Sequence, residues 1–165
     1  MKHQTAHDSE TPAHGQQVIT ACAFLHHDFA GVTKVFLPKR AETKKFLPGV
    51  YELPGGHIEH GEDIVDGLTR EIREEFGMPI SVGEPFAAFT YLNEVKGSHS
   101  IEVIFLAQFA DNIENIKIDP ADHSGFKWIG ADELSKVLSV NKTETDPEIQ
   151  AMKRGFTVLK QATIS

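Results

Sequence analysis

Residues 56–78 read GHIEHGEDIVDGLTREIREEFGM, and this stretch decides the expected fold and site. On a helix with 3.6 residues per turn, Glu71, Glu74 and Glu75 stand at i, i+3 and i+4 on one narrow face. Three neighbouring negative charges raise one another's pKa, so at least one carboxylate keeps a proton unless a cation joins them. The stretch therefore predicts a divalent-metal site.

This helix face offers only carboxylate oxygens, which suit Mg²⁺ or Mn²⁺ better than zinc. Asp63 is suited to cap the first turn, and Gly77 followed by Met78-Pro79 is suited to end the helix. The turn formed by residues 54–56, Pro-Gly-Gly, allows the backbone to approach a ligand closely. An apolar stripe a quarter turn away predicts the face that packs into a core; it comprises Val65, Leu68, Ile72 and Phe76.

The stretch resembles the signature of the Nudix hydrolases, G-x5-E-x7-R-E-U-x-E-E-x-G-U, in which U is apolar. Every specified position matches: Gly56, Glu62, Arg70, Glu71, Glu74, Glu75 and Gly77, with Ile72 and Met78 at the apolar sites. The segment before it, Tyr-Glu-Leu-Pro-Gly at residues 51–55, is similar to the family's lead-in, although Trp is common where Tyr51 stands. An isolated REIREE would more often be a solvated helix face, and the glycines and spacing favour the Nudix reading.

The resemblance implies that Glu71, Glu74 and Glu75 bind magnesium, with the Gly56 carbonyl as a further ligand. It implies that Glu62 and Arg70 form a supporting pair, in which Arg70 orients carboxylates. The implied reaction is hydrolysis of a diphosphate linkage by water that the metal activates.

The general base is left open between a glutamate of the signature and a carboxylate outside it. Glu102, within an otherwise apolar strand, is the first outside candidate, and Glu94 is the second. For both residues the favoured alternative is an ordinary surface acid.

Candidate substrate groups lie outside the signature. The cluster of Lys39-Arg40 and Lys44-Lys45 could hold phosphates or could be a solvated loop. Four aromatic rings could stack on a base or could belong to the core, namely Phe24, Phe46, Phe89 and Tyr91. His57 and His60 could contact phosphate, although surface or structural roles are favoured.

Sequence markers of Nudix subgroups narrow the substrate by elimination. We find neither the Ser-Gln-Pro-Trp array of NADH pyrophosphatases nor the proline of many ADP-ribose enzymes. The chain most resembles MutT-type nucleoside-triphosphate pyrophosphohydrolases, with nucleotide-sugar or ADP-ribose hydrolysis as the alternative. A function of another class, a Nudix-like module that senses a nucleotide without hydrolysis, is disfavoured by the intact glutamates.

Composition and periodicity complete the expectations. The 165 residues predict one domain at 17–165 after a disordered tail at 1–16. A net charge of −8 argues against bulk nucleic-acid binding, though a capped RNA end is not excluded. The absence of a long apolar run and the single Cys22 predict no membrane association and a cytoplasmic setting. A homodimer is left open.

The expected fold class is α/β, an α/β/α sandwich with a mixed β-sheet, which the Nudix resemblance also implies. Apolar alternation predicts strands at 18–26, 32–39, 50–53, 86–92, 100–110 and 126–129. Helices are expected at 131–138 and 147–162, in addition to the helix of the signature.

Overall fold

The computed structural model describes residues 10–162. Its strands are β1 (Gln17–Phe29), β2 (Val32–Arg40), β3 (Gly55–His57), β4 (Ile80–Asn93), β5 (Ser98–Phe109) and β6 (His123–Gly130). Its helices are α1 (Ile64–Phe76) and α2 (Pro147–Ala162), and two 3₁₀ helices are η1 (Ile113–Asn115) and η2 (Ala131–Val137).

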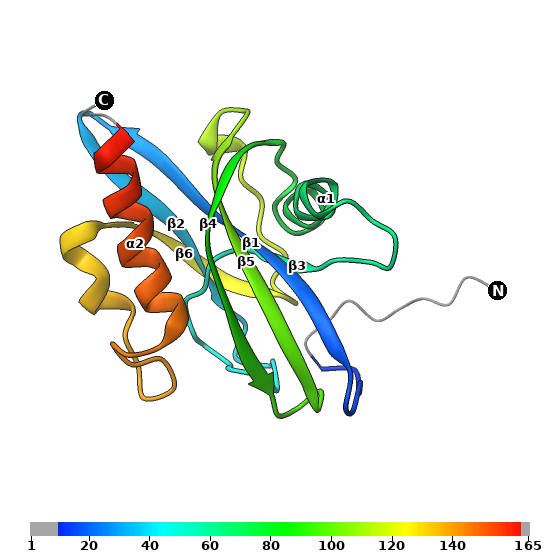
Figure 1. Ribbon diagram of the computed structural model, residues 1–165. Coiled ribbons are helices and arrows are strands. Elements are labelled where there is room, and N and C mark those ends of the chain that lie inside the picture. The colour runs from blue at the N-terminus through cyan, green and yellow to red at the C-terminus, as the bar shows by residue number, and fades with distance from the viewer. Residues whose placement is uncertain (1–9, 163–165) are drawn as a thin grey trace.

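The strands form one mixed sheet with α1 and α2 on opposite faces (Figure 1). The order is β4-β5-β1-β2-β6, and β3 adds to β1. The pairing of β1 with β5 is parallel, and the other pairings are antiparallel. The expected α/β/α sandwich with a mixed sheet is therefore confirmed.

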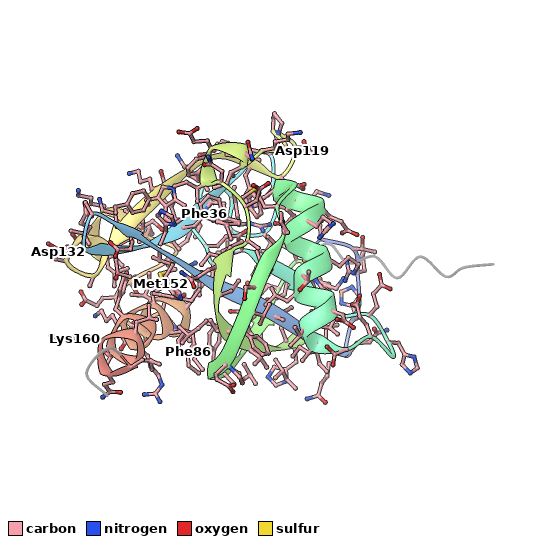
Figure 2. All side chains as sticks on the ribbon, turned by 90° about the horizontal axis from the view of Figure 1, so that it is seen from above. Phe36, Phe86, Asp119, Asp132, Met152 and Lys160 are labelled. Atoms are coloured by element: carbon pink, nitrogen blue, oxygen red, sulfur yellow. The ribbon has the colours of Figure 1, made fainter. Side chains whose placement is uncertain are left out.

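Successive side chains of β1 point alternately into two hydrophobic cores, one on each face of the sheet. Cys22 and Phe24 point to the α2 side, whereas Ala21 and Ala23 point to the α1 side. Figure 2 labels one member of each core, Met152 of α2 and Phe36 of β2. The apolar stripe of α1 is buried as expected at Leu68, Ile72 and Phe76, but Val65 is exposed because it lies at the edge of that face.

Two of the expected strands, 50–53 and 86–92, differ clearly from the structure. Residues 50–53 form no strand; Tyr51 makes an isolated bridge to Lys39, and the strand that joins β1 is β3. Residues 131–137 are helical as expected, but the helix is of the 3₁₀ type. β4 begins at Ile80, well before the expected residue 86, because residues 80–85 pair irregularly with the end of β5. Pairing between residues so far apart in the chain produces no recognisable pattern in the local sequence.

Part of the expected disordered tail lies outside the described residues, at 1–9. Residues 10–16 attach to the β4–β5 turn: Ala13 N–H donates to the Lys96 carbonyl at 2.8 Å and Gly15 N–H to the Gly97 carbonyl at 3.0 Å. Lys96 Nζ donates to the Thr11 carbonyl at 2.9 Å. These contacts are between main-chain groups or to a main-chain carbonyl, which apolar periodicity cannot reveal. Among residues 10–162, no helix is long and apolar enough to cross a membrane.

Candidate active site

Helix α1 is fixed at both ends by the residues expected to cap it. The Asp63 carboxylate accepts hydrogen bonds from the backbone N–H groups of Val65 and Asp66 at 3.0 and 3.1 Å. Gly77 adopts the left-handed conformation, with φ of 65°, and its N–H donates to the Arg73 carbonyl at 2.9 Å. These caps fix where the helix begins and ends, and so they fix the face from which the glutamate side chains project.

Arg70 is the centre of the site's hydrogen bonding. Its guanidinium binds Glu62 in a bidentate manner, at 2.8 and 3.0 Å. One nitrogen, Nη1, also donates to Glu71 at 3.0 Å and to Glu74 at 3.2 Å. Another, Nη2, donates to the His57 carbonyl at 3.1 Å. Arg70 thus joins the loop acid, β3 and two glutamates of α1, which agrees with the supporting role that the resemblance implied.

Glu71 lies against the glycine turn. It is 6% exposed, and burial raises its pKa to about 7, opposed by Arg70 and reinforced by Glu74. A Cβ atom added to Gly56 would overlap the Glu71 carboxyl group. A larger residue at position 56 would therefore push the Glu71 carboxyl group out of its present place.

Glu75 lies in an acidic environment that the sequence did not reveal. The side chain is half-buried, and burial raises its pKa well above the ordinary value. The charges of Glu52, Glu71 and Asp122 raise it further, while Arg40 opposes them. Neither Glu52 nor Asp122 was among the predicted site residues. Glu52 could have been found because it precedes the glycine turn, but Asp122 is brought here only by β6.

Glu52 is an ionised acid beside this cluster. Its two oxygens contact His123 Nε2 at 3.2 Å and Arg40 Nη1 at 3.3 Å. Burial alone would raise the Glu52 pKa, but the hydrogen bond with His123 and the charge of Arg40 bring the pKa below its ordinary value. Glu52 therefore contributes a negative charge to the site from outside α1.

The three glutamates of α1 do not converge on a point. Among residues 10–162, no three His, Cys, Asp or Glu side chains form a group ready to hold a metal ion. Arg70 holds Glu71 and Glu74, whereas the charge acting most strongly on Glu75 is that of Glu52. The donor set nevertheless suits Mg²⁺ or Mn²⁺, because all its donors are oxygens and the acids around Glu75 favour a cation.

Two of the predicted phosphate-binding cations, Arg40 and Lys44, are engaged within the protein. Arg40 is 12% exposed and donates to the Phe46 carbonyl at 2.8 Å as well as to Glu52. Lys44 binds Asp122 at 3.0 Å. Lys39 is the more open, with a 36% exposed side chain 3.9 Å from a Glu42 oxygen. A phosphate role for Lys39 or Arg40 stays a prediction.

The structure corrects the assignment of Phe24 as a substrate-stacking ring. Phe24 is fully buried in the α2-side core, where its ring packs edge-on against Phe86 and Phe156. No face of the ring is open to a base. Tyr91 stays a candidate: it is half-buried, and its ring lies 6.2 Å from that of Phe46 with an angle of 15° between the planes.

Glu102 is buried on the α2 side of the sheet and is 5% exposed. Its Oε1 accepts from Thr20 Oγ1 and Cys22 Sγ, each at 3.4 Å, while Oε2 has no hydrogen-bond partner in the described structure. Burial, and then the charge of Glu148, raise the Glu102 pKa to about 8. Glu94, the second outside candidate, is exposed in the β4–β5 turn.

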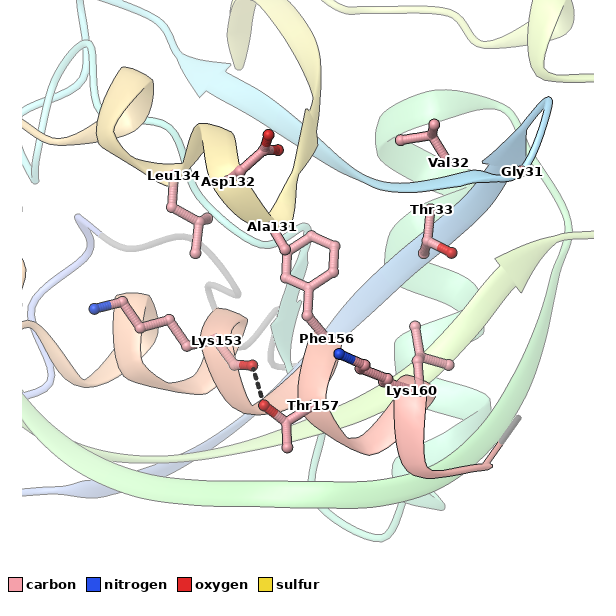
Figure 3. Close-up of a pocket in the computed structure, with 11 residues that line it drawn as sticks. Gly31, Val32, Thr33, Ala131, Asp132, Leu134, Lys153, Phe156, Thr157 and Lys160 are labelled. Carbon is pink, nitrogen blue, oxygen red and sulfur yellow. Dashed lines mark hydrogen bonds between the residues drawn. The ribbon is translucent and has the colours of Figure 1, made fainter. Parts of the chain in front are cut away.

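A cavity of about 630 Å³ lies between η2, α2 and the turn that joins β1 to β2 (Figure 3). Thr33, Asp132, Phe156 and Lys160 are among the residues that line it. The glutamates of α1 do not line this cavity. The site described above is therefore a different part of the molecule.

Comparison with solved structures gives the same fold. A Caenorhabditis elegans Ap4A hydrolase binary complex matches with a TM-score of 0.68 and 21% identity, over 88% of this chain and 98% of the other. The NUDIX domain of Shewanella oneidensis NrtR, complexed with ADP ribose, matches with a TM-score of 0.66 and 20% identity. That match covers 87% of this chain and 88% of the other.

Sequence relatives include an m7GpppN-mRNA hydrolase, NUDT17 of Danio rerio, with 29% identity over 64% of this chain and 40% of the relative. The nucleoside triphosphatase NudI of Escherichia fergusonii is 33% identical over 49% of this chain and 54% of the relative. The chain thus matches only about half the length of these relatives. The family model of the NUDIX domain matches residues 17–151, and the chain belongs to the NUDIX domain family.

Proposed function

We propose that the protein is a Mg²⁺-dependent hydrolase that cleaves a diphosphate linkage in a nucleoside diphosphate joined to another group. The first candidate substrate is a nucleoside triphosphate. The observation that carries this proposal is the face of α1, where Arg70 binds Glu62, Glu71 and Glu74 beside Gly56. A solvated charged helix would need neither the buried Glu71 nor the close glycine.

Glu71, Glu74 and Glu75, with the Gly56 carbonyl, would hold Mg²⁺ or Mn²⁺. Bound there, the metal would neutralise phosphate oxygens and lower the pKa of the attacking water. The chain's own contribution is orientation, because Arg70 is fixed by two bonds to Glu62 and turns its remaining donors to Glu71 and Glu74.

The proton acceptor is better sought at Glu52 than at Glu102. A carboxyl with a pKa of about 8 is mostly protonated at neutral pH, so Glu102 is ready to accept a proton only in alkaline solution. Glu52 is ionised and its charge acts on Glu75. We therefore place Glu52 ahead of Glu102 as the outside carboxylate, with Asp122 as the next candidate.

Similarity to NudI supports a nucleoside triphosphate as substrate. A capped RNA end is a second candidate, supported by NUDT17 and by a relative named NAD-capped RNA hydrolase, NudC of Stutzerimonas stutzeri, 28% identical over 69% of this chain. ADP-ribose or nucleotide-sugar hydrolysis stays an alternative, as does a sensor without hydrolysis. The cytoplasmic setting and the homodimer stay predictions.

The proposal is tested with purified protein and a panel of nucleoside triphosphates, nucleotide sugars, ADP-ribose, dinucleotides and capped RNA, with Mg²⁺ present or absent. We expect a nucleoside triphosphate to give a nucleoside monophosphate and pyrophosphate, resolved by anion-exchange chromatography. Turnover of capped RNA alone would favour the second candidate. Tight binding of a nucleotide with no product would refute hydrolysis and support the sensor.

A further inference from the structure

An ion pair lies buried between the start of α2 and the segment before the glycine turn. Lys142 Nζ contacts Glu148 Oε1 at 2.9 Å, and the side chains are only 3% and 14% exposed. Lys142 precedes α2, and Glu148 lies in its first turn. Removing two charges from water costs as much as their attraction returns, so such a pair is a poor source of stability. Another role is needed to explain it.

Both members of the pair bind the main chain on either side of Glu52. Lys142 Nζ donates to the Tyr51 carbonyl at 2.9 Å. The Leu53 N–H donates to Glu148 Oε1 at 2.8 Å. Residues 50–53 also bond to β2, because the Glu52 N–H donates to the Pro38 carbonyl at 3.0 Å and the Arg40 N–H donates to the Val50 carbonyl at 2.9 Å. The ion pair therefore adds a second attachment, to the carbonyl before Glu52 and the N–H after it.

Glu52, held between these two anchors, turns its carboxylate towards the α1 site. The carboxylate contacts Arg40 and His123, and the His123 ring lies 5.2 Å from the ring of Phe76, which follows Glu75 in α1. The charge of Lys142 also helps to lower the Glu52 pKa. A shift of the Tyr51–Leu53 backbone would therefore move a negative charge relative to the glutamates of α1.

We propose that Lys142 and Glu148 form a clamp that positions Glu52 against the carboxylates of α1. The clamp acts through Glu52 and touches no substrate, so Lys142 and Glu148 are positioning residues. This inference rests on the proposed function and adds a dependence of the active site on the start of α2, which packs on the opposite face of the sheet (Figure 1).

The first experiment removes the clamp without leaving an unpaired buried charge, in the double variant Lys142→Met/Glu148→Leu. Misplacement of a group near the reacting centre by about 1 Å can cost about 100-fold in rate. We expect kcat to fall about 10- to 100-fold and Mn²⁺ affinity, measured by electron paramagnetic resonance, to fall about tenfold. Wild-type kcat together with wild-type Mn²⁺ affinity would overturn the proposal.

The matched control is Lys153→Met/Glu144→Leu. This pair also joins α2 to the segment before it, at 2.7 Å, but its side chains are 41% and 68% exposed and it does not bind residues 51–53. We expect kcat and Mn²⁺ affinity within about twofold of wild type. If kcat and Mn²⁺ affinity fell as far as in the clamp variant, the effect would come from the C-terminal segment as a whole. That result would overturn the specific role of the clamp.

A second comparison separates positioning from folding. Glu148→Gln keeps an oxygen that can accept from the Leu53 N–H, whereas Glu148→Leu does not. Compared with Glu148→Gln, we expect Glu148→Leu to have a kcat about tenfold lower. We also expect its Leu53 amide hydrogen to exchange at least tenfold faster, while exchange of the β5 amides is unchanged. Equal kcat in the two variants, or faster exchange throughout the sheet, would overturn the proposal.

The proposed function and the clamp can fail separately. If wild-type protein hydrolyses no nucleotide in the panel, the proposed function fails. Mn²⁺ affinity and Leu53 exchange then still decide whether the pair positions the segment beside the α1 carboxylates.

Discussion

Replacing Glu102 with Gln should change the pH dependence of stability in a defined direction. The side chain is 5% exposed, and the pKa of its carboxyl is raised to about 8, chiefly by burial. Gln has nearly the same shape and can still accept from Thr20 and Cys22, but it never ionises. The variant therefore isolates the cost of charging this buried acid.

The sign follows from proton binding. Between about pH 4.5 and 8 the folded protein keeps a proton on Glu102 that the unfolded chain has lost, so the free energy of unfolding falls as pH rises. The difference between the two pKa values corresponds to at most about 5 kcal/mol. Glu102→Gln and wild type should be equally stable at pH 5. At pH 9 the variant should be more stable by up to that amount, which corresponds to at most about 10 to 20 °C in Tm.

Urea denaturation and thermal unfolding at pH 5, 7 and 9 measure the difference, with Glu94→Gln as the control. Glu94 is an exposed acid in the β4–β5 turn, and its replacement should leave the difference near zero at each pH. A stability difference for Glu102→Gln that is the same at pH 5 and pH 9 would refute the reasoning.

The same variant tests the general base at pH 7. We expect kcat within about threefold of wild type, because a protonated Glu102 cannot accept a proton. A fall of about 10² to 10⁴ with unchanged Mn²⁺ affinity would restore Glu102 as the base.

Three further predictions concern the metal site. EDTA should abolish hydrolysis and Mg²⁺ or Mn²⁺ should restore it; full turnover in metal-free buffer would contradict the mechanism. Glu75→Gln should lower kcat about 100-fold without lowering Tm, and near-normal kcat at limiting Mg²⁺ would contradict the assignment. Gly56→Ala should lower Mn²⁺ affinity and kcat, because the added methyl group overlaps the Glu71 carboxyl. Gly125→Ala, whose added Cβ meets no atom within 4 Å, should leave both near wild type.

The sequence by itself determined helix α1, its caps and the face that carries the glutamates. These features depend on residue spacing within about 15 positions, where helix geometry fixes which side chains meet. The pairing of Arg70 with Glu62 was equally accessible, because the family signature contains both residues and the structure joins them at 2.8 Å.

Only the tertiary structure decided what surrounds that face. His123 and Asp122 reach the site through β6, and Glu52 is held there by residues almost 100 positions away. Period-two alternation placed Glu102 beside Ile104 but could not say which side of the sheet that face meets. Burial raises the Glu102 pKa and closes Phe24 to substrate, and burial depends on long-range packing. The local sequence determines on which face of a helix or strand a side chain lies. The burial of that side chain and the charges around it depend on which elements the fold brings together.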